Sequence, residues 1–357
     1  MRSRIVRKLI EEWLLVISGT GLVVTSLWLR RMPAYAKHDF EVVFTLLVFL
    51  VVAKGLENSG FLHNLARRVG GGRALGLRLV LLTAILSMLV TNDVALLTVV
   101  PLTLAMNVPK KGSLVILETL TANGASALTP FGNPQNIFIY YHYHLHPVEF
   151  VRVILLFGVV SLLFVVVVTI LRVGRLTLVD DGVPVRVDGH AVVYLLSFVV
   201  FVAGVLHLLP LAVGCLPLIY ALAVDRRSLR IDFVLLATFL AFFGFTDNLM
   251  LMLEFNIQKP TQVFLASAFG SQFISNVPSA LLFADFTRNW QALLWGVSVG
   301  GFGNLIGSLA SLISYRFYKA HVSSTRSFLL EFHLLSYLAF GLGILTYFVF
   351  WLCETCG

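Results

Sequence analysis

The stretch Val90-Thr91-Asn92-Asp93-Val94 decides the fold, because it places polar residues in the middle of the apolar run 77–106. The apolar arm before it, from Leu77 to Val90, would form about 21 Å of helix at about 1.5 Å per residue. The hydrocarbon core of a bilayer is about 30 Å thick, so one such arm does not cross it. We therefore predict a re-entrant hairpin over 77–106 whose polar tip lies near the middle of the membrane.

A second polar interruption, Ile274-Ser275-Asn276-Val277-Pro278, lies in the apolar run 262–287. It has the same form as the first, with a short apolar arm on each side of a polar tip. We predict a second re-entrant hairpin there. Two polar tips in two such hairpins make a binding site between them the first functional hypothesis.

The composition of the whole chain is that of an integral membrane protein. Hydrophobic residues make up 58% of the sequence and charged residues only 12%, whereas soluble domains have about 25% charged residues. Apolar segments of helical length recur along the chain, which excludes the short alternating strands of a β-barrel. The net charge of +8 comes from basic residues between the apolar segments, a pattern of cytoplasmic loops that gives no reason to expect a nucleic-acid partner.

The chain divides into two halves joined by the polar linker 172–189. The first half, 1–171, contains the hairpin 77–106 and a broken helix over 113–142. The second half, 190–357, contains the hairpin 262–287 and a broken helix over 291–318. The predicted fold is an all-α polytopic membrane protein with these two hairpins and about nine spanning helices, at 13–29, 41–56, 113–142, 150–171, 190–208, 211–224, 232–250, 291–318 and 327–351.

The two halves are predicted to be inverted repeats. Five crossings separate the helix that begins near Asp39 from the one that begins near Asp232, and an odd number of crossings inverts the second repeat. With both hairpins re-entrant, most lysines and arginines fall on the cytoplasmic side, as the positive-inside rule requires. We therefore expect a multi-pass protein of the plasma membrane with its N-terminus in the cytoplasm and its C-terminus outside.

The broken helices would bring exposed backbone to the level of the hairpin tips. The segment 124–136 contains two prolines and two glycines and does not hold a continuous helix, and 300–308 is rich in glycine. Helix N-termini in the membrane suit an anionic group, whereas unwound carbonyls and side-chain amides suit a small cation such as Na⁺. The predicted binding residues, which share a place at a tip or a break, are Thr91, Asn92, Asp93, Ser126, Thr129, Gly132, Asn133, Pro134, Asn136, Ser275, Asn276, Gly303, Asn304 and Ser308.

The tips and the first break resemble those of the ion transporter superfamily, which includes citrate and dicarboxylate/sodium symporters, arsenite permeases and one class of Na⁺/H⁺ antiporters. The stretch 91–95, Thr-Asn-Asp-Val-Ala, resembles the first tip of arsenite permeases. The stretch 132–136, Gly-Asn-Pro-Gln-Asn, is similar to the small-Pro-Asn turn of the symporters, and Ser275-Asn276 matches the start of their Ser-Asn-Thr tip. The resemblance implies a scaffold and a mobile transport domain, an elevator-like movement and a homodimer.

The chain departs from the symporter signature at Asp93 and Val277, where that signature has threonine. An ionisable residue at membrane depth is a functional hypothesis by default, and Asp93 could couple protons, hold Na⁺ or repel anions. Asn92 or Asp93 could also cap the helix that follows. A Na⁺ site would use Asn92, Asp93, Asn133 and Asn276, and no cofactor beyond coupling Na⁺ or H⁺ is expected.

The sequence predicts a secondary active transporter for a small anion, such as a carboxylate, an inorganic oxyanion or arsenite. Na⁺/H⁺ exchange is the alternative. An intramembrane enzyme is disfavoured because the sequence has no His-Glu-x-x-His and no Gly-x-Ser-x-Gly motif. A channel is disfavoured because sealed tips suit a carrier.

Overall fold

The computed structural model describes residues 13–70, 74–106, 108–174, 187–252, 257–322 and 325–356, and their regular structure is entirely helical. The helices of the first half are α2 (Trp13–Leu29), α3 (Lys37–Asn58), α4 (Phe61–Gly70), α5 (Leu75–Val90), α6 (Asn92–Ala105), α7 (Lys111–Ser126), α8 (Pro134–His142) and α9 (Pro147–Arg172). Those of the second half are α10 (His190–Val205), α11 (Cys215–Ala223), α12 (Phe233–Met252), α13 (Pro260–Ile274), α14 (Asn276–Ala284), α15 (Trp290–Gly300), α16 (Leu309–His321) and α17 (Arg326–Cys356). Three short 3₁₀ helices are η1 (Leu211–Gly214), η2 (Arg226–Leu229) and η3 (Leu305–Gly307).

Three of the described helices are long and apolar enough to cross a membrane, namely Pro147–Arg172, Arg226–Met252 and Arg326–Val349. The helix predicted at 211–224 is shorter than expected, because η1 takes its first turn and α11 has only 9 residues. At about 1.5 Å per residue α11 is about 13 Å long, less than half of a bilayer core. Helix α4 was not predicted, because its residues lie outside the apolar segments from which we assigned helices. Most of the linker 172–189 and the N-terminal residues 1–12 lie outside the described residues.

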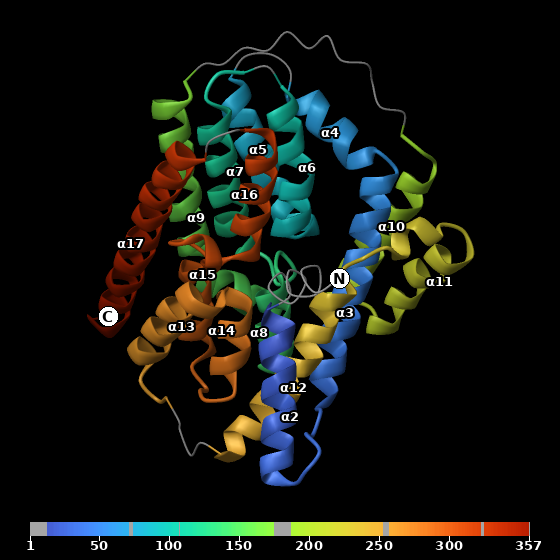
Figure 1. Cartoon of the computed structure of the whole chain (residues 1–357), viewed down its shortest axis with the longest axis vertical. Coiled ribbons are helices and arrows are strands. Elements are labelled where there is room, and N and C mark those ends of the chain that lie inside the picture. Colours follow the sequence, from blue (N-terminus) through green and yellow to red (C-terminus); the bar gives the residue numbers. More distant parts are fainter. Residues whose placement is uncertain are drawn as a thin grey trace, which may run out of the picture.

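Two pairs of short helices lie in different halves of the molecule. The helices α5 and α6 pack side by side in the upper half of Figure 1, and α13 and α14 pack side by side in the lower half. A single residue joins the helices of each pair, Thr91 in the first and Ser275 in the second. These pairs fall on the two apolar runs, 77–106 and 262–287, in which we predicted hairpins.

The broken helices lie beside the two pairs. Helix α7 ends at Ser126 and α8 begins at Pro134, so the chain leaves the helix over the Gly/Pro-containing segment between them. Helix α15 ends at Gly300 and α16 begins at Leu309. Each pair packs against the broken helix that follows it, α5 and α6 against α7, and α13 and α14 against α15.

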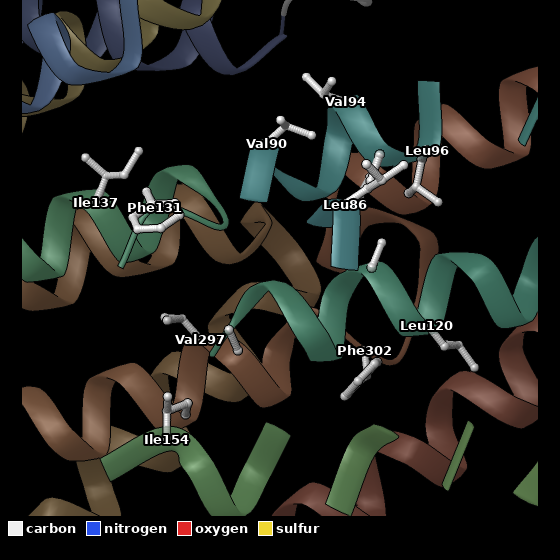
Figure 2. Packing of buried hydrophobic residues seen from close by; sticks show 14 of the residues in the cluster. Leu86, Val90, Val94, Leu96, Leu120, Phe131, Ile137, Ile154, Val297 and Phe302 are labelled. Carbon is white, nitrogen blue, oxygen red and sulfur yellow. The ribbon is translucent and has the colours of Figure 1, made fainter. Parts of the chain in front are cut away.

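The longer helices flank these elements. The helices α9 and α17 lie side by side at the left of Figure 1, and α2 packs along α12 at its lower end. One buried core joins the two halves, as Figure 2 shows for Val90 and Val94 of the first pair, Phe131 of the first break, and Val297 and Phe302 of the second half. Their burial explains why the broken segments hold a fixed shape near the centre.

Candidate functional site

Both helix pairs turn at a residue with the same unusual backbone conformation. Thr91 has φ 97° and ψ 151°, and Ser275 has φ 73° and ψ 157°. This region is almost confined to glycine, and other residues in it cost about 1–3 kcal/mol and cluster at functional sites. Helix α6 begins directly after Thr91 and α14 directly after Ser275, so each tip presents the N-terminus of a helix, which carries partial positive charge.

The first break is folded by its own amides. The Asn133 side chain accepts a hydrogen bond from the Asn136 backbone N–H at 3.1 Å and donates to the Ser126 hydroxyl at 3.0 Å. The Asn136 amide donates to the carbonyls of Ser126 (3.2 Å) and Thr129 (2.8 Å). A Cβ on Gly132 would lie 2.1 Å from the Ser126 carbonyl oxygen, so only glycine fits there. Asn133 therefore caps α8, with Pro134 in its first turn.

The second break, between α15 and α16, is also held in shape by side-chain hydrogen bonds, but from different residues. The Asn304 side chain accepts from the N–H groups of Ile306 (2.8 Å) and Gly307 (2.9 Å). Gln272 on α13 donates to the carbonyls of Gly300 (2.9 Å) and Phe302 (2.8 Å), and its side-chain oxygen accepts from the Asn304 N–H at 2.9 Å. Gln272 thus ties the second pair to the second break.

The first tip is tied to the first break in a similar way. The Asn92 backbone N–H donates to the Gly132 carbonyl at 3.0 Å. The Thr129 hydroxyl donates to the carbonyl of Met88 in α5 at 2.8 Å. Each tip and its neighbouring break are therefore one hydrogen-bonded unit.

Asn123 on α7 joins these two units across the molecule. Its side-chain oxygen accepts from the Asn92 amide at 3.4 Å and from the Ser308 hydroxyl at 2.9 Å. Its amide donates to the Gly301 carbonyl at 3.1 Å and to the Ser311 hydroxyl at 3.2 Å. The full hydrogen-bonding capacity of this buried side chain is used, and its partners come from both halves.

The second tip, at Asn276, also lies close to the residues that Asn123 binds. The Asn276 amide nitrogen lies 3.1 Å from the position that a Cβ on Gly301 would take. The carbonyl of Gly301 is also bound by Asn123, which holds Asn92 on its other side. Asn92 and Asn276, 184 positions apart in the sequence, are thus linked through two intermediate residues.

Asp93 has a different environment from its neighbours. One of its carboxylate oxygens, Oδ1, is buried and has no hydrogen-bond partner. The hypothesis that Asn92 or Asp93 caps α6 is wrong, because the N-cap is Thr91 and it makes no side-chain cap hydrogen bond. Asn92 is the first residue of the helix, and its side chain accepts from the Asp93 N–H at 2.9 Å. The negative charge of Asp232 has an electrostatic effect on Asp93. The Asp232 side chain itself accepts hydrogen bonds from the N–H groups of the first turn of α12. A buried carboxylate oxygen without a donor is a group that a cation or a proton would satisfy.

Asn123 and Gln272 were not among the residues predicted for the site. Both lie within continuous helices, where a polar residue gives no local sign of its role. The sequence nevertheless contained a signal, an Asn or Gln inside an otherwise apolar helix. Such a side chain has four hydrogen-bonding sites, and when it is buried they need partners from neighbouring elements. The predicted residues all lie at the tips, at the breaks or, for Ser308, at the N-terminus of α16. As a group they offer helix N-termini to an anion and amide or hydroxyl oxygens to a cation.

Comparison with known proteins identifies the class of molecule to which this site belongs. The family model described as citrate transporter matches residues 8–300. An uncharacterized transporter of Methanocaldococcus jannaschii is 29% identical over 89% of this chain and 92% of its own length. The inner membrane protein YbiR of Escherichia coli is 32% identical over 90% of each chain. The silicon efflux transporter LSI3 of Oryza sativa is 33% identical over 38% of this chain and 30% of its own length. The chain is therefore a membrane transporter rather than an enzyme, and it belongs to the citrate transporter family.

Proposed function

We propose that this protein is a secondary active transporter that carries a small anion, such as a carboxylate, an inorganic oxyanion or arsenite, by alternating access. The observation that carries the proposal is the convergence of both tips on the Asn123–Gly301 link. The N-termini of α6 and α14 supply positive charge without a basic side chain, which suits an anion that must be released again. Amides and hydroxyls around them supply directed hydrogen bonds.

The same arrangement supports a membrane architecture for transport. We assign α5–α6 and α13–α14 as re-entrant hairpins of two inverted repeats, since the first pair lies in the upper half and the second in the lower half of Figure 1. The tip–break units would move together as a transport domain in an elevator-like step. A homodimer in the plasma membrane, with the N-terminus in the cytoplasm and the C-terminus outside, completes the proposal.

Asp93 is the residue that we assign to ion coupling. Its unpartnered oxygen needs a proton, a cation or a donor, because an isolated carboxylate is costly at membrane depth. Na⁺ would find further oxygen ligands in the side chains of Asn92, Asn133 and Asn276. A proton would need no further ligand.

The test is uptake into proteoliposomes that contain the purified protein. Labelled citrate, succinate, arsenite, phosphate and silicic acid are offered in turn, with a Na⁺ gradient and a pH gradient imposed separately. We expect accumulation of one class of solute under one of the two gradients. Silicic acid is included because a relative that matches part of the chain is a silicon efflux transporter.

Na⁺/H⁺ antiport is the second candidate function. The observation that favours it is the buried carboxylate oxygen of Asp93 that has no hydrogen-bond donor, since such a group suits a cation or a proton more than an anion. The same proteoliposomes distinguish the two functions. Proton release driven by Na⁺ alone, with no anion accumulated from the panel, would replace the anion transporter by the antiporter.

A further inference from the structure

A chain of four titratable side chains lies at the end of the molecule opposite α4. His38 Nε2 lies 3.3 Å from Asp39 Oδ1 and 3.2 Å from His142 Nδ1, and His142 Nε2 lies 3.8 Å from Asp285 Oδ1. The imidazole rings of His38 and His142 meet edge to face, with centroids 5.0 Å apart. The four side chains line one cavity of about 100 Å³, enough for about three water molecules.

The cavity lies between two groups of helices. His142 is the last residue of α8, and Asp285 directly follows α14. His38 and Asp39 belong to the first turn of α3, and Thr246 and Asp247 of α12 line the same cavity. The chain of side chains therefore crosses from α8 and the end of α14 on one side to α3 on the other, and α12 lines the cavity beside α3.

The two helices α8 and α14 connect this cavity directly to the central site. Each has 9 residues, which makes it about 13 Å long. Their N-termini carry Asn133 and Asn276, and their opposite ends carry His142 and Asp285. A change in how these ends pack against α3 and α12 would move the site residues at the other ends.

The charges around the cavity leave the chain of four groups without a fixed cation. Arg31 is paired with Asp247, and Lys37 with Glu41. Among the described residues, the ion pairs that Asp39 and Asp285 make are with histidines. A histidine can supply a counter-charge only when it binds a proton.

The other titratable groups near His142 do not supply a fixed positive charge to Asp39 or Asp285. The ring of His144 lies 6.3 Å from that of His38, and His144 is exposed. The Tyr143 hydroxyl donates to the carbonyls of Ala284 and Thr287. Tyr35 donates to the Leu240 carbonyl. Helices α14 and α15 contain no ionisable residue.

We propose that Asp39, His38, His142 and Asp285 form a proton-binding site that holds α8 and α14 against α3 and α12. One proton bound within the four groups, on a carboxyl or on an imidazole ring, can be shared along the contacts that join them. Without that proton, two carboxylates face each other across the cavity with no counter-charge. The packed arrangement therefore binds the proton more tightly than the separated one, is favoured at low pH, and is lost as the pH rises.

Hydrogen–deuterium exchange of the full-length protein in detergent tests this proposal without any transport assay, so it can fail independently of the proposed transport function. Exchange is measured for peptides covering 134–146 and 276–287 at pH 6 and pH 8 and is corrected for the chemical exchange rate. Protection of both should be higher at pH 6. If the pKa of the site differs by one unit between the packed and the separated arrangement, the equilibrium between them, and with it the protection factor, can change by about tenfold.

Three variants assign the effect. His38→Gln and Asp285→Asn each replace a titrating side chain by a non-titrating one of similar shape. Each variant should lose the pH dependence of protection. His63→Gln is the matched control, because His63 is an exposed histidine of α4 at the other end of the molecule, and it should keep the wild-type response. Equal protection of the wild type at both pH values, greater protection at pH 8, or an unchanged response in Asp285→Asn would overturn the proposal, even if His38→Gln did not fold.

Discussion

Thr91 and Ser275 share one backbone conformation, with φ 97° and ψ 151° in the first and φ 73° and ψ 157° in the second, although they lie in different halves of the chain. Each is the single residue between two antiparallel helices, and each has a hydroxyl side chain where glycine would be free of strain. The chain thus keeps a costly residue at two corresponding tips. Such strain is expected where a site is held in a set geometry.

Replacing Thr91 by glycine should therefore stabilise the protein. Relief of backbone strain is worth about 1–3 kcal/mol and outweighs the entropic cost of glycine, about 0.5–1 kcal/mol. Thermal unfolding of the purified protein in detergent measures the change. The matched control is Thr346→Gly in the middle of α17, which should lose about 1 kcal/mol. Equal losses in both variants would show that the tip is not strained.

Removing the Asn123 side chain should weaken the link between the two halves. Asn123→Ala leaves the Asn92 amide, the Gly301 carbonyl and the Ser308 hydroxyl without this partner. Buried unsatisfied groups cost about 1–3 kcal/mol, so the unfolding temperature should fall clearly. Asn58→Ala, at an exposed position of α3, should change the stability by no more than about 0.5 kcal/mol. A similar shift in both variants would contradict the role of Asn123.

A side chain at Gly303 should disrupt the second break. Gly303 has φ +96°, and a Cβ there would lie 2.2 Å from the Gln272 oxygen that accepts from the Asn304 N–H. Gly303→Ala should therefore greatly reduce the yield of monodisperse protein in size-exclusion chromatography. Gly341→Ala, which has open space around its Cβ in α17, should leave the yield unchanged. Normal yield of both variants would count against the described shape of the break.

Replacing Asp93 by asparagine should remove ion coupling and keep the fold. The variant retains the size of the side chain, and the helix start is secured by Asn92, which accepts from the backbone N–H of residue 93. Solute uptake into proteoliposomes should lose its dependence on Na⁺ or pH, measured at several values of each. A wild-type ion dependence in Asp93→Asn would move the ion site to Asn133, Asn276 and Asn304.

Two single-cysteine variants should report opposite faces of the membrane. Lys110 precedes α7 at the open end of the first pair, and Lys259 precedes α13 at the open end of the second. In a chain with Cys215, Cys353 and Cys356 replaced by serine, a cysteine at position 110 should be labelled from the cytoplasm. A cysteine at position 259 should be labelled from outside. Labelling of both from one face would refute the inverted arrangement.

The sequence predicts the polar tips and the first break well, because the signals there are local. An asparagine followed by proline, as at Asn133 and Pro134, is typical of a helix start. Thr91 likewise interrupts an apolar run that is otherwise uniform. The whole-chain composition likewise predicts an all-α membrane protein. In these cases the type of residue and its immediate neighbours are enough to predict the local structure.

The remaining features depend on partners that are distant in the sequence. Asn123 matters because Gly301 and Ser308 meet it from the other half, and Gln272 because it reaches the second break. The short length of α11 is decided by the turns at its ends rather than by its apolar residues. No local pattern distinguishes such positions from ordinary helical ones.

The packing of α2 against α12 has a consequence for the order in which the protein is made. The Asn248 amide donates to the hydroxyls of Thr25 and Ser26, and Thr25 precedes it by 223 positions. A ribosome adds about 5–20 residues per second, so Thr25 emerges about 10–45 s before its partner. Throughout that interval the membrane-insertion machinery or the lipid must accommodate α2 without its final neighbour, so α2 completes its docking late in biogenesis.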